Sequence, residues 1–325
     1  VWTLPGNTAG RFPRTEVFEL PFMMNNAEAT SKAYWEYVQT VAPDEFKDTH
    51  VLALHVHGPG MFHTVDKQIK TAADLKGLKL RGPTRQSTKL LASLGATPVG
   101  MPLPGIPDAL SKGTINGCII PWEVVPAVKV HELVKYHTEF PPNTTALYTT
   151  TFVMAMNKAK YESLSPDLKK VIDANSGLQT SGWLGKVQQG NDAVGRKSAV
   201  DRGNTIYTIA PNDVQDFVKR SSLIDDEWVA DMNKRGFDGK GTADQIVRER
   251  PEVAFAPSRD ARTTLGGRDG QRRHADHRIV AAPPCELQKR MARAGGGNRN
   301  HHFRDDFVGL HRGGVQSLKK VARGH

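Results

Sequence analysis

The sequence predicts an α/β fold with largely parallel sheets, on three observations. Apolar runs of strand character alternate with segments of helical periodicity through residues 1–245. Glycine and proline residues end several of the strand-like runs, as they do in turns between such elements. The chain has 325 residues, which is enough for one large domain or for two smaller lobes with separate cores.

The first predicted helix spans residues 27–41, where apolar residues recur at helical spacing and Asn25 or Asn26 can cap the first turn. A strand follows over residues 51–57, and Gly58-Pro59-Gly60 ends it. This helix and strand begin the alternation on which the fold prediction depends.

The middle of the chain repeats the alternation with shorter elements. A strand that ends at Arg81 is followed at once by Gly82-Pro83, which turns the chain away, and the next helix stops at Gly95. The predicted elements are a strand over residues 76–81, a helix over 84–94, a strand over 97–99, a short helix from 107 to 110 and a buried strand over 117–120.

The last part of the body begins with a run of Thr, Tyr, Phe and Val over residues 148–156, which favours a strand. Ser165 as the N-cap and Pro166 at the first helical position then start a long helical stretch. A strand over residues 204–210 and an amphipathic helix over 211–235 follow. The apolar stripe of that helix consists of Val214, Phe217, Val218, Ile224, Trp228 and Met232.

The net charge of +10 comes mostly from the C-terminal part of the chain. Residues 251–325 contain 12 Arg and 3 Lys against 7 acidic residues, which leaves only +2 on the remainder. This part has ten Gly and neither Trp nor Tyr, so it cannot bury enough apolar surface to offset its ordering entropy. We expect residues 246–325 to be an atypical basic tail, disordered or non-native. A natural basic extension and a small nucleic-acid-binding module are the alternatives.

Several classes of protein find no support in the sequence. It has no run of 18 apolar residues, so we expect no transmembrane helix. The start, Val1-Trp2-Thr3-Leu4-Pro5, lacks the basic region of a signal peptide and resembles a chain joined partway through a fold. Cys118 and Cys285 cannot form a disulfide framework or a zinc site of the CxxC type. GxSxG, P-loop and HExxH motifs are absent, so we expect no enzymatic activity and no cofactor.

Several short segments occur in an order and at a spacing that is specific in combination. They include Glu19-Leu20-Pro21-Phe22, the eleven residues from Thr71 to Arg81, Gly95-Ala96-Thr97-Pro98-Val99, Gly113-Thr114-Ile115-Asn116-Gly117 with Pro121 beyond it, and Leu164-Ser165-Pro166-Asp167-Leu168. In these segments, over about residues 1–245, the chain resembles the substrate-binding proteins of TRAP transporters, which form the DctP family.

The resemblance implies a periplasmic-binding-protein-like fold in which two hinge-joined lobes enclose a ligand. We place lobe I at residues 1–58 and about 153–192, and lobe II at 59–152 and about 193–245. The resemblance also implies that an opening stretch with the signal peptide is missing before Val1. It implies a periplasmic receptor, expected to be a monomer, that captures a small mono- or dicarboxylate and delivers it to the TRAP membrane permease. We expect no nucleic-acid partner.

Arg81 is the residue on which the predicted site depends. It ends a strand, and the carboxyl ends of strands in open α/β sheets face the ligand crevice. A guanidinium offers a planar pair of donors that matches a carboxylate. Because the arginine at this position of the family motif grips the ligand carboxylate, the resemblance implies the same role for Arg81. From the residue alone, a solvated strand-end arginine is the alternative.

Other residues are candidates for contact with the ligand, each with a plainer alternative. His57, at the expected lobe junction, can donate to the ligand, and Thr151 can offer its hydroxyl or simply favour a strand. Met61 falls near a second cleft arginine of sialic-acid-binding members, which favours a smaller or more apolar acid here. Trp122 can stack on an aliphatic or aromatic ligand or pack in the core. Glu123 can bond a ligand hydroxyl or amine, or remain a surface acid.

A metal site, an enzymatic function and a nucleic-acid-binding function are alternatives to a carboxylate receptor. His55 and His57 share one face of a strand, with His63 nearby, but no third ligand of fixed geometry is evident, so we expect no metal. The first rival is an α/β enzyme acting on a small carboxylate, for which the sequence lacks a nucleophile–base pair. The second rival is nucleic-acid binding through the basic tail.

Overall fold

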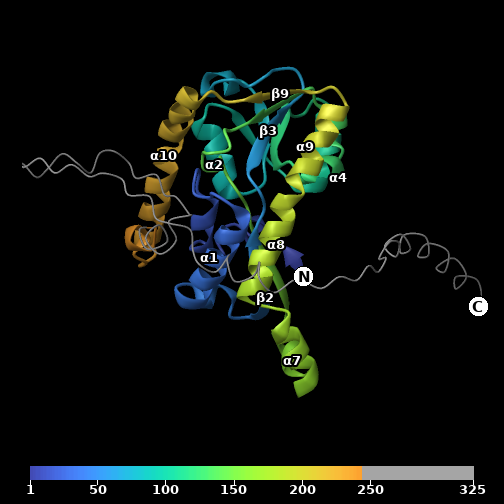
Figure 1. Ribbon diagram of the computed structural model, residues 1–325. Coiled ribbons are helices and arrows are strands. Elements are labelled where there is room, and N and C mark those ends of the chain that lie inside the picture. The colour runs from blue at the N-terminus through green and yellow to red at the C-terminus, as the bar shows by residue number, and fades with distance from the viewer. Residues whose placement is uncertain (244–325) are drawn as a thin grey trace, which may run out of the picture. The chain divides into compact units, whose positions relative to one another are not determined.

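The computed structural model describes residues 1–243, whose strands form two sheets (Figure 1). The strands are β1 (Trp2–Thr3), β2 (Thr49–Val56), β3 (Gly60–Thr64), β4 (Lys79–Gly82), β5 (Thr97–Gly100), β6 (Gly117–Pro121), β7 (Tyr136–Glu139), β8 (Thr151–Asn157) and β9 (Thr205–Thr208). The small sheet has the order β1-β8-β2, and the large sheet has the order β5-β4-β6-β3-β7-β9.

Helices surround both sheets. The α-helices are α1 (Ala27–Thr40), α2 (Arg85–Ser93), α3 (Ile106–Ser111), α4 (Val124–Ala127), α5 (Val130–Leu133), α6 (Lys158–Glu162), α7 (Pro166–Ala174), α8 (Leu178–Gly190), α9 (Asp192–Asp201) and α10 (Pro211–Lys234). The 3₁₀ helices are η1 (Pro5–Asn7), η2 (Thr15–Glu19), η3 (Pro43–Phe46), η4 (Ala72–Leu75) and η5 (Leu103–Gly105). Within residues 1–243, no helix has the length and apolar character needed to span a bilayer.

Local capping explains where the predicted helices begin. The Asn26 side chain accepts a hydrogen bond from the Ala29 N–H at 2.8 Å, so the start of α1 is confirmed. At α2, Ser87 Oγ accepts from the Thr84 N–H at 2.8 Å, in a reciprocal capping box with the Thr84 side chain. The predicted helical stretch after Ser165 is divided into α7, α8 and α9. Gly177, with φ of 90°, separates α7 from α8, since other residues adopt this conformation only with strain.

The α/β class is confirmed, and both parallel and antiparallel pairs occur in the sheets. β4 runs parallel to β5 and β6, and β7 runs parallel to β9, as the alternating pattern predicts. β3 lies antiparallel between β6 and β7, and the small sheet is antiparallel throughout. β3 enters the large sheet from β2 of the small sheet through Gly58-Pro59, without an intervening helix. The sequence pattern does not predict β3.

The helices α8 and α9 follow each other in the chain, and they pack on different sheets. α1 and α8 pack on β2 in the small sheet, while α9 packs on β9 in the large sheet. α7, α8 and α9 therefore follow one side of the described part from one sheet to the other (Figure 1). The lobe boundaries near residues 58, 152 and 192 remain predictions. The predicted tail, residues 246–325, lies outside the described residues.

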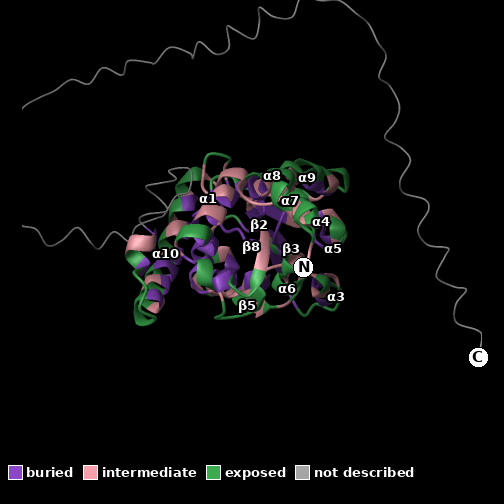
Figure 2. Cartoon of the chain, turned by 90° about the horizontal axis from the view of Figure 1, so that it is seen from below, coloured by how far each residue is buried: buried purple, intermediate pink, exposed green. Residues whose placement is uncertain are grey.

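The predicted amphipathic helix over 211–235 is confirmed as α10. Buried and exposed residues alternate along this helix, as the colours of Figure 2 show, and most of the buried ones are apolar. The indole Nε1 of Trp228 donates to the Pro13 carbonyl at 2.9 Å, which attaches α10 to the segment before η2. α10 also packs on α2. The buried apolar set on α10 is Val214, Phe217, Ile224, Trp228 and Met232.

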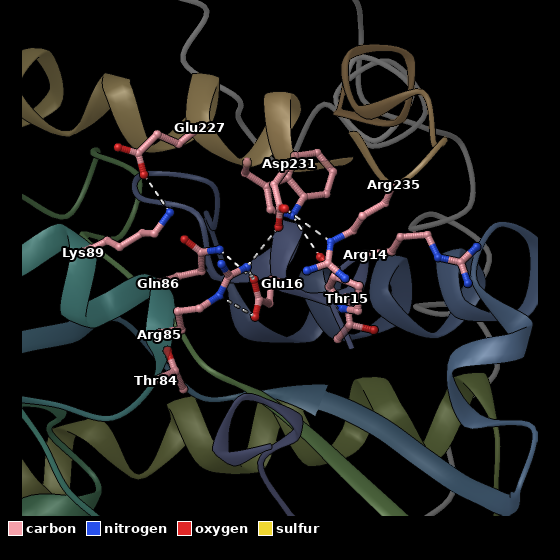
Figure 3. A network of polar contacts seen from close by, with 12 residues as sticks. Arg14, Thr15, Glu16, Thr84, Arg85, Gln86, Lys89, Glu227, Asp231 and Arg235 are labelled. Atoms are coloured by element: carbon pink, nitrogen blue, oxygen red, sulfur yellow. Dashed lines mark hydrogen bonds and ion pairs between the residues drawn. The ribbon is translucent and has the colours of Figure 1, made fainter. Parts of the chain in front are cut away.

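Glu16 on η2 connects this segment to α2 and α10 (Figure 3). Its Oε1 accepts from Arg85 Nε at 3.1 Å, while its Oε2 accepts from Arg85 Nη2 and, at 2.7 Å, from Gln86 Nε2. The same guanidinium lies 3.6 Å from Asp231 on α10. Because the Glu16 side chain is only 6% exposed, this two-point ion pair is shielded from water and is stronger than a surface pair.

Removal of the Glu16 carboxylate tests this connection. Glu16→Ala leaves Arg85 and Gln86 without their acceptor, and we expect a loss of about 2–3 kcal/mol in the free energy of unfolding. The loss is moderated because the Arg85 side chain remains 31% exposed. Urea unfolding measures it. The control is Asp216→Ala, which breaks an exposed pair with Arg220 on α10 and should cost less than about 1 kcal/mol. Equal losses would contradict the assigned role.

Candidate functional site

The guanidinium of Arg81 is buried and has no acidic partner within the part of the chain that the structure describes. The residue is 4% exposed, at the third position of β4. Its Nε donates to the Met101 carbonyl at 3.0 Å and its Nη1 to the Ile119 carbonyl at 3.4 Å. Burial lowers the pKa of Arg81, although an arginine remains charged. Two backbone carbonyls therefore orient a desolvated cation whose Nη2 makes no hydrogen bond among residues 1–243.

Tyr148 lies beside this cation. Its ring covers Gly60, where a Cβ would overlap the ring, and its carbonyl accepts from the Gly60 N–H at 3.0 Å. The Tyr148 hydroxyl is buried and has no partner in the described part of the chain. Burial raises the pKa of Tyr148 and the charge of Arg81 opposes that rise, so the two groups interact electrostatically. A free hydroxyl beside a buried cation suits a ligand anion, because both groups can donate to it.

His57, directly after β2, is held as a neutral ring. Its Nδ1 lies 2.5 Å from the Gly58 carbonyl, so Nδ1 carries the proton and donates. Its Nε2 then accepts from the Thr150 hydroxyl at 3.0 Å. Burial lowers the pKa of His57 to about 4, and the Arg81 charge contributes in the same direction. Both ring nitrogens have protein partners in this structure, and the predicted donation from His57 to a ligand remains a prediction.

Aromatic rings continue outward from Arg81 along β2 and β8. The His57 ring meets Tyr148 edge-on at 5.6 Å and Phe152 edge-on at 6.1 Å. Phe152 stacks on His55 at 4.8 Å and on Trp2 at 4.9 Å, measured between ring centroids. Trp2 Nε1 also donates to His55 Nε2 at 2.8 Å. A row of aromatic rings therefore begins at His57 and Tyr148, the two rings on which the Arg81 charge acts, and such rings suit a flat apolar ligand.

Thr151 begins β8 and is engaged with Glu19, the last residue of η2. Its N–H and its hydroxyl donate to Glu19 Oε1 at 3.0 Å and 2.7 Å. Burial raises the pKa of Glu19 to about 7, while the hydrogen bonds from Thr151 oppose that rise. The predicted contact between the Thr151 hydroxyl and a ligand remains a prediction, but in this structure the hydroxyl already has an acceptor.

Met61, Trp122 and Glu123 lie at or beside a pocket of about 440 Å³ that Gly60 also lines. Met61 and Trp122 line this pocket, whereas Arg81 does not. Trp122 is 2% exposed, donates from Nε1 to Glu139 Oε2 at 3.3 Å, and has its ring 5.2 Å from that of His63. These contacts support its packing role. The Glu123 N–H donates to Asp192 Oδ1 at 3.0 Å, and burial raises the pKa of the Glu123 carboxyl.

The histidines considered for a metal site have other partners. His63 Nδ1 lies 2.7 Å from His137 Nδ1, and His63 Nε2 lies 3.1 Å from the Ile120 carbonyl. His55 accepts from Trp2 and stacks on Phe152. Among residues 1–243, no group of three or more His, Cys, Asp or Glu side chains is arranged to hold a metal ion.

The sequence indicates Arg81 and His57 as candidate ligand contacts, but it does not indicate two residues near them, Tyr148 and Glu19. Tyr148 was assigned only to a run with strand character, and Glu19 entered only as part of a family motif. The available signal for Glu19 was an acidic residue inside an apolar stretch, Val17-Phe18-Glu19-Leu20. Tyr148 carries no such signal, since its role depends on Arg81, 67 positions earlier in the chain.

Comparison with known families gives one match over most of the chain. The family model described as bacterial extracellular solute-binding protein, family 7 (DctP), matches residues 1–230. Among curated proteins, the chain is 25% identical over 232 residues to the outer membrane transporter protein TsaT of Comamonas testosteroni, covering 70% of this chain and 68% of that protein.

Two solved structures are more similar in sequence. A TRAP solute-binding protein from Rhodoferax ferrireducens T118, in complex with copurified benzoate, is 66% identical with a TM-score of 0.75, covering 77% of this chain and 79% of that chain. A marine metagenome TRAP solute-binding protein specific for aromatic acid ligands, co-crystallised with 3-hydroxybenzoate, is 49% identical with a TM-score of 0.74 and the same coverage.

The neutral state of His57 makes a testable contribution to stability. Its folded pKa of about 4 lies below the ordinary 6.5, so between these values the unfolded chain binds the proton first. This contribution is complete above about pH 6.5 and is lost as the pH falls toward 4. We expect His57→Gln to flatten the loss of unfolding free energy on acidification, measured by urea unfolding from pH 7 to 4.5. An identical slope in both proteins would contradict the assignment.

Proposed function

This chain belongs to the DctP family of bacterial extracellular solute-binding proteins, and we propose that it captures an aromatic monocarboxylate for a TRAP transporter. The family is one of solute receptors and not of enzymes. The finer points of the proposal are the class of acid, the residue that holds it and the delivery to a membrane permease.

The observation that carries the proposal is the desolvated Arg81 guanidinium without a carboxylate partner among residues 1–243. Burial of an uncompensated charge costs several kcal/mol, and a ligand carboxylate of opposite charge offsets that cost. The free Nη2 of Arg81 and the free Tyr148 hydroxyl are two donors for such a group. A monocarboxylate is favoured because the adjoining His57 ring is neutral and supplies no second positive charge.

The aromatic surroundings support a ring as the rest of the ligand. The charge of Arg81 acts on His57 and Tyr148, whose rings meet edge-on, and aromatic contacts of this kind stabilise ring pairs beyond simple area burial. The 66% identical protein from Rhodoferax ferrireducens was found with benzoate, and the 49% identical metagenome protein was co-crystallised with 3-hydroxybenzoate. At these levels of identity, a related ligand class is the simplest inference.

Capture proceeds by closure of the two lobes around the acid. A ligand that binds only the closed form shifts the population toward that form. Closure of this kind uses a few hinge positions, and the direct passage from β2 through Gly58-Pro59 into β3 is one candidate. The closed, loaded receptor then delivers the acid to the TRAP permease from the periplasmic side of the membrane.

A thermal-shift screen tests the ligand class. Benzoate, 3-hydroxybenzoate and phenylacetate should raise the melting temperature, whereas acetate and succinate should not. At 100 times the dissociation constant, the ligand stabilises the protein by about 2.7 kcal/mol. For a domain of this size, that corresponds to a shift of about 5 °C or more. If succinate shifts the midpoint and no aromatic acid does, the aromatic assignment is wrong.

Replacement of Arg81 tests the anchor. Arg81→Ala removes the charged partner of the carboxylate, so we expect the dissociation constant for benzoate to rise at least 100-fold. Arg81→Lys keeps the charge but loses the planar fork and should have an intermediate affinity. Isothermal titration calorimetry measures both. Arg220→Ala, at an exposed position on α10, is the matched control and should bind like the unmodified protein. Unchanged affinity in Arg81→Ala would refute the anchor role.

A further inference from the structure

Three glutamates are buried in the described part of the chain, and they differ in what their carboxylates contact. Glu16, Glu19 and Glu45 are 4%, 2% and 8% exposed. Glu16 has a two-point ion pair with Arg85, and Glu45 lies 3.7 Å from Arg14 Nε. Within residues 1–243, Glu19 is the member of this set that pairs with no cation.

Glu45 and Glu19 share one anchoring motif, which makes the difference between them informative. Each accepts hydrogen bonds from the N–H and the hydroxyl of one threonine, Thr15 for Glu45 and Thr151 for Glu19. Glu45 also uses its second oxygen, which accepts from the Arg14 N–H at 2.8 Å. The second oxygen of Glu19, Oε2, is buried and has no hydrogen-bond partner in the described part of the chain.

One tyrosine hydroxyl near Glu19 is in the same condition. Tyr148 is fully buried, and its hydroxyl has no partner among residues 1–243. The Glu19 charge helps to raise the pKa of Tyr148, after the larger effect of burial. Tyr34 is also fully buried near Glu19, and it has the hydroxyls of Thr15 and Thr151 within reach. Buried polar atoms in native proteins are satisfied in the great majority, so the open Glu19 oxygen and the open Tyr148 hydroxyl indicate a missing partner.

The position of Glu19 connects this polar group to the Arg81 site. Thr151 follows Tyr148 by three residues, and Tyr148 interacts with the charges of both Arg81 and Glu19. On the other side, a Cβ at Gly6 would lie 3.4 Å from Glu19 Oε1 and would overlap Thr84, the N-cap of α2. Glu19 therefore stands where η2, β8 and the start of α2 meet, with Tyr148 as the link to the cation.

We propose that Glu19 is a specificity-determining residue of the Arg81 site, and that its free oxygen accepts a hydrogen bond from a ring hydroxyl of the ligand. The preferred ligands are then hydroxylated aromatic acids, with the carboxylate on Arg81 and the hydroxyl toward Glu19 and Tyr148. This inference rests on the proposed function, because it assumes that an aromatic acid is bound at Arg81. An ordered water on Glu19 is the competing occupant.

A site built to bond a substrate hydroxyl discriminates strongly against the analogue that lacks it, since the buried polar groups are then left unpaired. An apolar wall would give no such preference. The Tyr148 hydroxyl can rotate to donate to or accept from the same ligand oxygen, so the subsite tolerates either protonation state of the Glu19 carboxyl.

The test compares ligands that differ only in the hydroxyl. Dissociation constants for benzoate, 3-hydroxybenzoate and 4-hydroxybenzoate are measured by calorimetry for the unmodified protein, Glu19→Gln and Glu19→Leu. We expect one hydroxybenzoate to bind at least 10-fold more tightly than benzoate to the unmodified protein. Glu19→Leu should reduce that preference at least 10-fold, because it weakens the binding of the hydroxybenzoate more than the binding of benzoate. Glu19→Gln, which retains hydrogen-bonding groups and guards against misfolding of the leucine variant, should reduce it about 3-fold or more.

Glu45→Gln is the matched control, since it alters an equally anchored buried carboxylate whose second oxygen is occupied. It should leave the ratio of the dissociation constants for benzoate and the preferred hydroxybenzoate unchanged. Arg81 variants, in contrast, should weaken the binding of all three acids together. An unmodified protein that binds benzoate through Arg81 but shows no hydroxyl preference, or Glu19 variants that weaken all acids equally, would overturn the Glu19 inference and leave the proposed function intact. Absence of binding for all three acids would overturn the proposed function itself.

Discussion

A desolvated guanidinium without a counter-charge is the constraint on which the site depends. A folded chain removes Arg81 from water at a cost of several kcal/mol and, in the described part, provides two backbone carbonyls but no carboxylate. Backbone carbonyls orient the fork without neutralising it. The positive charge of Arg81 therefore remains uncompensated within residues 1–243, and an anion of matching shape can neutralise it. The uncompensated charge of Arg81 is the physical basis of the proposal that this residue holds the carboxylate of an acid.

The site lies where the chain passes between its two sheets. His57 follows β2, Gly60 opens β3, and Tyr148 leads into β8. Close approach of the backbone is essential there, because a Cβ on Gly60 would overlap Tyr148 and one on Gly58 would overlap Asp192. In the proposed function, a ligand bound at this crossing contacts groups of both sheets, and such contacts would couple binding to the proposed closure.

The buried polar groups of the described region divide into satisfied and open ones. The network of Glu16 with Arg85 and Gln86 fills both carboxylate oxygens and holds η2 to α2, so it acts as structure (Figure 3). Near Arg81 the pattern is reversed, with the Tyr148 hydroxyl and one Glu19 oxygen left open. Satisfied networks stabilise a fold, whereas open ones weaken it. Open atoms also occur elsewhere in residues 1–243, among them Gln86 Oε1 and Asp231 Oδ2, so the ones near Arg81 are set apart by the buried cation and not by their number.

The sequence by itself predicts features that depend on neighbouring residues in the chain. They are the Asn26 cap of α1, the strand that ends near Arg81, and the apolar stripe of α10. It does not predict contacts between distant segments. β3 follows the Gly58-Pro59-Gly60 turn, and its residues show no pattern that predicts a strand. It forms because it pairs with β6 and β7, which lie far along the chain. Glu19 meets Thr151 across 132 positions. Whether a buried polar atom has a hydrogen-bond partner depends on all of its neighbours in space. The order of residues along the chain does not show these neighbours.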